Sequence, residues 1–220
     1  VAHEVNTPLT GISSFTQMLL EGADSDDPKT KVLEKIERQT FRAAKIVNGL
    51  LNLARPVKVE TGPVDVNAVV NEVLVLLEHQ LKTSHISVRK DLVSPPPIAT
   101  GLDYKLQQVF LNLFLNARDA MPKGGWLSIE TRRHGDRVVI KVGDTGKGIS
   151  ADHLSRIYDP FYTTKELGQG TGLGLSITYG IVQEHDGTIE CESIEGQGTR
   201  FSITFPLTAS VLARQGDLSS

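Results

Sequence analysis

The chain has 220 residues, 39% of them hydrophobic and 22% charged, and its formal net charge is −3. This balance is typical of a soluble globular protein, excludes a disordered chain, and gives no support to nucleic-acid binding. The single cysteine, Cys191, excludes a disulfide framework, fits a cytoplasmic location, and is expected to be a small strand residue. No apolar run approaches the roughly 20 residues that span a bilayer. Because the chain lacks an initial methionine, we expect a fragment, and any sensor domain or membrane anchor would precede Val1.

Residues 1–56 are predicted to form two helices. Apolar residues recur at helical spacing from Val5 to Leu19, a turn cluster occupies 22–28, and a heptad seam runs from Val32 to Leu53. Two helices alone bury too little surface for a stable core. The wide apolar face therefore predicts a four-helix bundle made by a homodimer. Packing of this face on the rest of the chain is the alternative.

The remainder is predicted to be a separate α+β domain over 62–208, followed by a flexible tail at 209–220. Arg55-Pro56 ends the second helix, and residues 55–64 read as the boundary. Helical patterns cover 65–82, 102–121 and 173–185, with Asp65 or Asn67 as the first N-cap. Strand patterns cover 84–92, 126–133, 137–143, 187–193 and 199–206. Helices mixed with hairpin-linked strands indicate a two-layer sandwich with helices on one sheet face.

The segment from His3 to Leu9 carries a candidate nucleophile. A neutral imidazole is nucleophilic, and the adjacent Glu4 carboxylate can accept the other ring N–H and steady positive charge as an N–P bond forms. The segment resembles the H-box of sensor histidine kinases, which implies that His3 is phosphorylated. Glu4 and Thr7 also match a Glu-x-x-Thr pattern that supports dephosphorylation of the partner in that family. Packing or capping by Thr7 is the alternative.

A second motif runs from Asn112 to Ala120. Asn112 and Asn116 are four residues apart and share a helix face, where amide oxygens suit Mg²⁺. The motif resembles the N-box of the GHKL superfamily of ATP-binding proteins, which implies nucleotide contacts for Asn112, Asn116 and Asp119, with Mg²⁺ on Asn116. Asn112 stands where hydrolysing relatives carry a glutamate base, and Asp119 stands where many kinases carry a lysine. The candidates for the charge facing the phosphates are Arg118, Lys123 and Lys165.

Glycine-rich motifs follow a predicted strand. The stretch from Asp144 to Ile149 resembles the G1 box, in which a carboxylate accepts the adenine amine and glycines let backbone approach the base. Residues 159–165 resemble the F-box. Residues 168–175 resemble the G2 box, whose backbone N–H groups suit phosphate oxygens. We expect the stretch between the F-box and the G2 box to close over ATP as a lid. Residues 196–199 match the last glycine signature, with a plain hairpin turn as the alternative.

The resemblance assigns nucleotide contacts to many residues of these glycine-rich motifs. They are Asp144, Gly146, Gly148, Ile149, Phe161, Thr164, Lys165, Gly170, Thr171, Gly172, Leu173, Gly174 and Thr199.

All the motifs occur in the order typical of sensor histidine kinases over about residues 1–207. The resemblance implies a helical dimerisation and phosphotransfer domain, a GHKL ATP-binding domain with a mixed sheet, ATP and Mg²⁺ as cofactors, and a response-regulator receiver domain as partner. The FYTTK stretch at 161–165 resembles the nitrogen-regulation branch. Positions Ser14, Gln17 and Met18 are expected to contact the regulator. Two alternatives stay open: an ATPase of the gyrase or Hsp90 kind, which predicts a glutamate at 112, and a nucleotide-binding scaffold without kinase activity.

Overall fold

The computed structural model describes residues 61–165 and 171–208, together with 12, 15–16, 18–19, 27–33 and 36 near the N-terminus. The chain divides into two compact units, one of residues 1–57 and 163–173 and the other of residues 58–162 and 174–220. The predicted domain limits at 56, 62 and 208 stay predictions. Among the described residues, no helix combines the length and the apolar character that crossing a bilayer requires.

The described N-terminal residues of the first unit are helical apart from a bend at Asp27. The Asp27 carboxylate accepts a hydrogen bond from Lys29 N at 2.8 Å, and its carbonyl oxygen accepts one from Thr30 N at 3.0 Å, so Asp27 caps the helical turn that follows. Pro28 suits the start of this turn because an N–H there would have no helical partner. The exposed large apolar side chains of these helical residues are Ile12, Phe15, Met18, Leu19, Val32 and Ile36. Residues 22–26 of the predicted turn and the seam beyond Ile36 lie outside the described residues.

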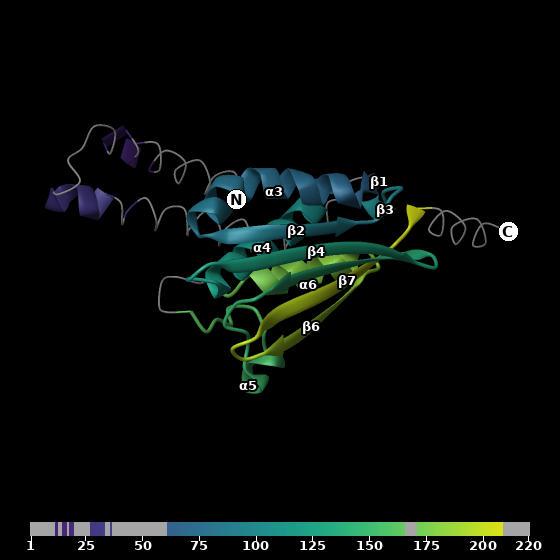
Figure 1. The fold of residues 1–220 in the computed structure, drawn as a ribbon. Helices are drawn as coiled ribbons and strands as arrows, with labels where there is room; N and C mark the ends of the chain where they lie inside the picture. The colour runs from purple at the N-terminus through teal and green to yellow at the C-terminus, as the bar shows by residue number, and fades with distance from the viewer. Residues whose placement is uncertain are drawn as a thin grey trace. The chain divides into compact units, whose positions relative to one another are not determined.

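A five-stranded mixed sheet is the base of the second unit, in the order β2-β4-β5-β7-β6 (Figure 1). The strands are β2 Ile86–Leu92, β4 Gly125–His134, β5 Arg137–Asp144, β6 Thr188–Ile194 and β7 Gly198–Pro206. β2 pairs with β4 in parallel, and the other neighbours are antiparallel. All five strands confirm the predicted ones to within two residues at each end. Cys191 lies in β6 as predicted, and burial raises the pKa of its thiol to about 12, so the thiol stays protonated.

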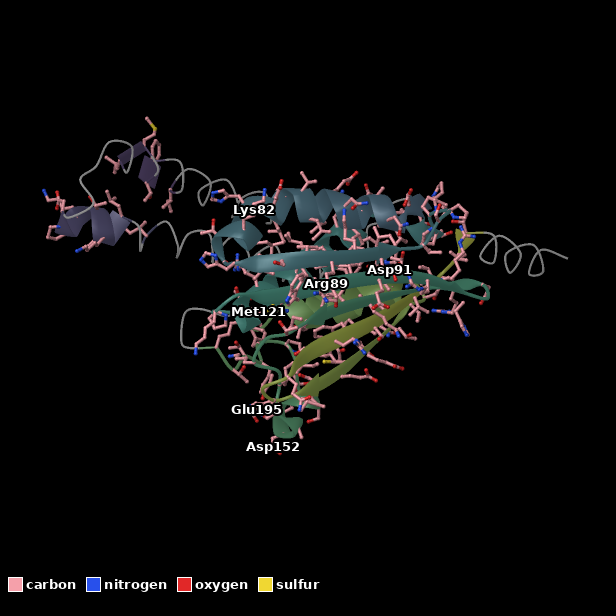
Figure 2. The ribbon with its side chains drawn as sticks, in the orientation of Figure 1. Lys82, Arg89, Asp91, Met121, Asp152 and Glu195 are labelled. Carbon is pink, nitrogen blue, oxygen red and sulfur yellow. The ribbon has the colours of Figure 1, made fainter. Side chains whose placement is uncertain are left out.

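Three helices cover one face of this sheet: α3 Val66–Thr83, α4 Asp103–Ala120 and α6 Gly174–Glu184 (Figure 1). Each matches its predicted range to within one residue. The Asp65 carboxylate accepts a hydrogen bond from Ala68 N at 2.9 Å, so Asp65 is the N-cap of α3. The other face of the sheet carries polar and charged side chains, among them the exposed Arg89 and Asp91 of β2 (Figure 2).

Three short elements were not predicted from the sequence. β1 Gly62–Asp65 pairs antiparallel with β3 Ile98–Gly101, so part of the predicted interdomain boundary is a strand of the second unit. The third is α5 Ala151–Leu154, which lies between the predicted G1 box and the predicted F-box. Elements of four residues are too short to show a period of 2.0 or 3.6 residues, and only pairing with distant residues defines them.

The core of the second unit forms between α4 and the inner face of the sheet. The side chains of Leu106, Phe110 and Phe114 of α4 are fully buried, and so are those of Leu127 and Ile129 of β4. Packing contacts join α4 to α3 on one side and to α6 on the other. This burial fixes the orientation of α4, and with it the direction in which the two asparagines of the predicted N-box point.

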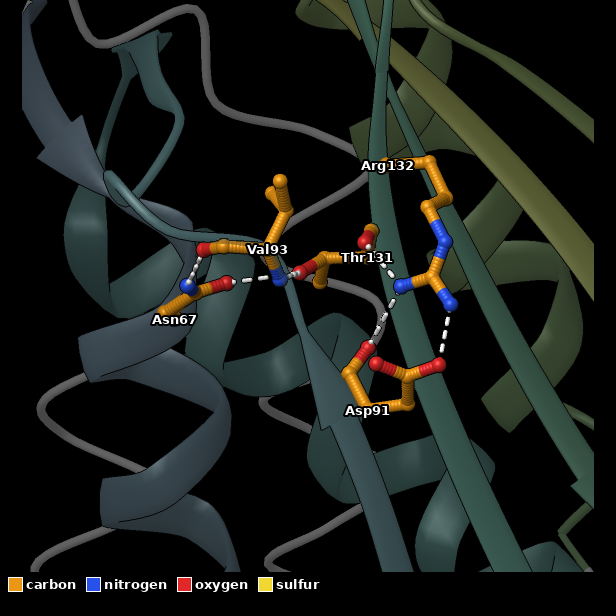
Figure 3. A network of polar contacts seen from close by, with 5 residues as sticks. All are labelled: Asn67, Asp91, Val93, Thr131 and Arg132. Carbon is orange, nitrogen blue, oxygen red and sulfur yellow. Dashed lines mark hydrogen bonds and ion pairs between the residues drawn. The ribbon is translucent and has the colours of Figure 1, made fainter.

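A closed ring of three hydrogen bonds joins α3, β4 and the end of β2 (Figure 3). Asn67 Nδ2 donates to Val93 O, Val93 N donates to Thr131 Oγ1, and Thr131 Oγ1 donates to Asn67 Oδ1, each at 2.9 Å. Thr131 is fully buried on the helix-covered face of the sheet. The ring therefore satisfies a polar side chain inside the core and sets the height of α3 over the sheet.

Replacing Thr131 with valine should lower the free energy of unfolding by about 1–3 kcal/mol, because Val93 N and Asn67 Oδ1 would lose their partner in the core. Urea unfolding followed by circular dichroism measures this. The matched control is Thr188→Val on the exposed edge strand β6, which should change stability by roughly 0.5 kcal/mol or less. Equal effects of the two substitutions would contradict a structural role for the ring.

A buried histidine, His185, joins the end of α6 to the start of α4. Its Nε2 accepts a hydrogen bond from Leu102 N at 3.0 Å, so its Nδ1 carries the proton that is donated to Ile181 O at 2.7 Å. Burial lowers the pKa of His185, an effect that Lys105 reinforces and that the Ile181 carbonyl, Glu184 and Asp186 oppose. The folded state therefore favours the neutral imidazole.

In the unfolded chain this histidine binds a proton near pH 6.5, whereas in the folded chain its pKa is lower. Protonation therefore favours the unfolded state, and the free energy of unfolding should fall as the pH falls below 6.5. Between pH 7 and pH 5.5 the loss from His185 should be at most about 1 kcal/mol, the limit for an imidazole that stays neutral in the folded state. Urea unfolding at these two pH values should show this loss in the wild type and a smaller one in His185→Gln. His134→Gln, on the exposed β4–β5 hairpin, should keep the wild-type dependence. A full-sized loss in His185→Gln would show that other groups cause it.

Candidate functional site

The predicted N-box lies on α4, where Asn112 is nearly buried with 7% of its surface exposed. Its Nδ2 donates to Gly174 O at 3.1 Å and to Thr178 Oγ1 at 3.3 Å, both on α6. The carboxamide therefore ties the middle of α4 to the first turn of α6. As a carboxamide it has no basic atom that could take a proton from water.

Asn116 lies one turn further along α4 and is half-buried. Its carboxamide makes no hydrogen bond to any residue that the structure describes, so the oxygen is available to a ligand. A free amide oxygen is the kind of donor that Mg²⁺ takes. Asn116 thus fits the metal-binding role that the N-box resemblance implies.

Some of the charged side chains at the end of α4 already contact other protein groups. Asp119 accepts from Arg118 Nε at 3.0 Å and from Nη2 at 2.7 Å, and Arg118 Nη1 donates to Gln80 Oε1 on α3. Of the three cations considered for the phosphates, Arg118 is therefore already held by protein groups. Lys123 is exposed after the end of α4.

Asp144 ends β5 and is the predicted acceptor for the adenine amine. Its Oδ1 accepts a hydrogen bond from Gly146 N at 2.8 Å. Burial raises the pKa of the Asp144 carboxyl, while backbone hydrogen bonds from Gly146 and Thr199 act in the opposite direction. A partly desolvated carboxylate in a fixed position is suited to accept from a neutral N–H group such as an exocyclic amine.

The loop after Asp144 is held by close backbone contacts on two sides. Lys147 N donates to Ala120 O at 3.0 Å, and Gly196 N donates to Lys147 O at 2.8 Å. A side chain at Gly146 would meet Ala120 O at 2.5 Å. Gly148 has a positive φ of 67°, and a side chain there would clash with the Ile194 carbonyl. The two glycines of the predicted G1 box are therefore required by packing as well as by any ligand.

A residue that the sequence analysis did not select, Ser193, joins this loop to the β6–β7 hairpin. Ser193 Oγ accepts from Ile149 N at 2.8 Å, donates to Gly198 O at 2.9 Å and lies 2.9 Å from Thr199 Oγ1. The predicted adenine contact Thr199 is thus buried next to Ser193. The signal was present in the predicted hairpin, because its pairing places Ser193 opposite Thr199.

Phe161 begins the predicted F-box contacts at the boundary between the two units. It is 61% exposed and adopts a left-handed φ of 67°, a costly conformation for an aromatic residue. Thr164, Lys165 and Thr171 to Leu173 belong to the first unit, where Lys165 N donates to Thr163 Oγ1 at 3.2 Å. Gly174 is the first residue of α6 in the second unit. The predicted site residues outside the described part of the chain are His3, Glu4, Thr7 and Gly170.

Two sequence families match the chain. The family described as histidine kinase-, DNA gyrase B- and HSP90-like ATPase matches residues 101–209, and the His Kinase A phospho-acceptor domain matches residues 1–57. The catalytic domain of the histidine kinase ThkA has 30% identity and a TM-score of 0.62, covering 67% of this chain and 96% of the ThkA domain.

The chain belongs to the sensor histidine kinase family. Sensor histidine kinase ZraS of Escherichia coli O157:H7 is 34% identical over 216 residues, which are 98% of this chain and 47% of ZraS. The chain thus spans about half the length of this curated relative. Full-length ShkA in complex with AMPPNP is 26% identical with a TM-score of 0.74, covering 94% of this chain and 44% of ShkA. ThkA in complex with the response regulator TrrA is 27% identical with a TM-score of 0.70, covering 94% of this chain and 60% of that chain.

Within this family member, the geometry brings together part of the predicted site. Within the second unit, Asp144, Gly146, Gly148, Ile149 and Thr199 form one hydrogen-bonded loop system. The α4 asparagines and Gly174 form a second group through the Asn112 bond to α6. The two groups are joined at the end of α4 by the Lys147 bond to Ala120. Membership of the nitrogen-regulation branch stays a prediction.

Gly148→Ala should reduce both stability and nucleotide affinity, because the added methyl group would push the loop away from Ile194. Gly135→Ala is the matched control, since Gly135 has a similar φ of 60° and nothing within 4 Å of an added methyl group. Both variants should lose about 1 kcal/mol for the left-handed conformation, and only Gly148→Ala should lose more. Urea unfolding and titration with a fluorescent ATP analogue measure the two effects. Equal losses in both variants would rule out the packing role of Gly148.

Proposed function

We propose that this chain binds Mg-ATP, phosphorylates its own His3 and passes the phosphoryl group to an aspartate of a response-regulator receiver domain. The observation that carries the proposal is the hydrogen bonding of the Asn112 carboxamide. Its NH₂ group is committed to Gly174 O and Thr178 Oγ1 of α6, at the position where hydrolysing GHKL proteins carry a glutamate base. A site without that base does not activate water, which favours transfer to a protein nucleophile over hydrolysis.

The adenine amine donates to the Asp144 carboxylate, and the phosphates extend toward the start of α6, where helical N–H groups suit anions. Asn116 would hold Mg²⁺ through its free amide oxygen, and the ion supplies neutralisation of phosphate charge. Within the described residues no group of three His, Cys, Asp or Glu side chains forms a metal site. Lys165 of the lid and Lys123 supply the protein cations.

The chemical step is an in-line displacement at the γ-phosphorus. A His3 ring nitrogen forms the new N–P bond, the bond from phosphorus to the bridging oxygen of ADP breaks, and Glu4 accepts the hydrogen bond of the other ring N–H. Positioning and charge stabilisation supply most of the rate in such a transfer. Thr7, four residues after His3 in the sequence, would position water when the same domain dephosphorylates its partner.

Two features support the proposed partners. The apolar side chains of Phe15, Met18, Leu19 and Val32 are more than half exposed, which suits a helical hairpin that a second copy covers. The relative ThkA forms a complex with the response regulator TrrA. We therefore place the receiver domain on the helical unit near Met18. Ser14 and Gln17, the other expected contacts, lie outside the described residues. We propose that this part of the protein is located in the cytoplasm.

Incubation with γ-labelled ATP and Mg²⁺ tests the proposal. The wild type should acquire acid-labile, alkali-stable label, His3→Gln should acquire none, and Asn116→Ala should be slower by roughly 100-fold, because metal stabilisation of the phosphates is worth several kcal/mol. His79→Gln, an exposed histidine on α3, is the control and should label like the wild type.

Different failures separate the alternatives. Release of inorganic phosphate without labelled protein would indicate an ATPase. Binding of a fluorescent ATP analogue with neither labelled protein nor phosphate release would indicate a scaffold. Label that persists in His3→Gln would place the acceptor elsewhere.

A further inference from the structure

The uncovered face of the sheet carries one row of residues that crosses all five strands. The strand pairing aligns Arg89 with Ser128, Ser128 with Gly143, Gly143 with Arg200, and Arg200 with Glu192. Successive residues of a strand face opposite ways, so this row lies on the side away from the helices. The order across the sheet is therefore arginine, two small residues, arginine and glutamate.

The small residues form the floor of a hollow of about 510 Å³, and the arginines are in its walls. Arg89 and Arg200 are three strands apart, which places their Cα atoms about 14 Å from each other. Gly143 has no side chain, and a methyl group added there would meet Ser128 Oγ at 2.7 Å. A larger residue at this position would occupy the space between the two arginines.

The two arginines have unused hydrogen-bond donors. The Arg89 guanidinium lies 3.7 Å from the ring centre of Trp126, a stacking that orients the group and leaves the N–H groups at its edge available. Neither Arg89 nor Arg200 makes a side-chain hydrogen bond or ion pair with a described residue. Arg132 on the same face differs, since it is paired with the Asp91 carboxylate and donates to Asp91 O and Thr131 O (Figure 3).

The charge between the walls is positive. Glu192 also lines the hollow and is the partner of Arg200 in the strand register, but it forms no ion pair with Arg200 among the described residues. Its strand lies on the side of Arg200 away from Arg89. The space over Ser128 and Gly143 is thus flanked by two cations. Carboxylates match the planar fork of a guanidinium and accept from it in pairs.

We propose that this hollow, formed by Arg89, Trp126, Ser128, Gly143 and Arg200, is a docking site for an acidic segment of a partner protein. The hollow lies on an open sheet face and cannot enclose a small molecule in the way that typical ligand pockets do. Its spacing suits carboxylates two or more residues apart on an extended chain. Tryptophan and arginine are also the residues that most often contribute binding energy at protein interfaces.

The hollow borders the proposed nucleotide contacts, because Asp144 and Thr199 are also among the residues that line it. Gly143 and Thr145 line the hollow, and Asp144 between them carries the carboxylate assigned to adenine on the helix-covered side. A partner docked on the hollow would thus contact the backbone that positions Asp144. The proposal itself does not depend on kinase activity.

Trp126 is the only tryptophan of the chain, so its fluorescence reports directly on the hollow. The 220-residue protein is titrated at low salt with the peptide acetyl-Glu-Glu-Glu-Glu-amide, and with the glutamine peptide of the same length. The glutamate peptide should change Trp126 emission saturably, and the glutamine peptide should not. Arg200→Ala, which does not touch the indole, should weaken binding by about five- to tenfold, as loss of a charge-assisted pair predicts.

The matched control is Arg132→Ala, which removes the same charge from the same face but leaves the hollow unchanged. It should weaken peptide binding by less than about twofold. No saturable change with the glutamate peptide would overturn the proposal, and so would equal losses in the two variants, which would indicate attraction to general surface charge. A far-UV circular dichroism spectrum like that of the wild type shows that each variant is folded.

Discussion

The carbonyl oxygen of Ala120, the last residue of α4, accepts a hydrogen bond from Lys147 N. This contact joins the helix that carries Asn112 and Asn116 to the loop that follows Asp144. It requires backbone to approach backbone, which is why Gly146 has no room for a side chain. The same loop meets the β6–β7 hairpin through Gly196 N and Ser193 Oγ. The position of Asp144 is therefore set by helix, loop and hairpin together.

Both ends of α4 and its middle are held by different chemistry. Its start is held by the buried His185 ring, which accepts from Leu102 N. Its middle is held by the Asn112 carboxamide, which donates to α6. Its apolar side chains fill the core against the sheet. Since α6 begins at the end of the proposed lid, its attachment at Asn112 gives the lid a fixed point on the nucleotide-binding unit.

Most of the second unit could be predicted from the sequence because its elements are long and their periods are clear. The Asp65 cap follows from local chemistry, and the structure confirms it. The β1–β3 pair could not be predicted, since four-residue strands are defined by partners far away in the chain. Ser193 was missed because a serine in a strand has no distinctive local signal, and its role depends on register. The row from Arg89 to Glu192 depends on register across five strands, which no single segment reveals.

The strand order also has a consequence for how the chain is made. β7 is the last strand in the sequence, but it lies between β5 and β6 inside the sheet. Until residues 198–206 leave the ribosome, β5 has an open edge and β6 has no neighbour to pair with. Thr199, which completes the loop system around Asp144, arrives on the same strand. Closure of the sheet and completion of the proposed adenine end of the site are thus one late event, so a nascent chain is expected to bind nucleotide only after its fold is finished.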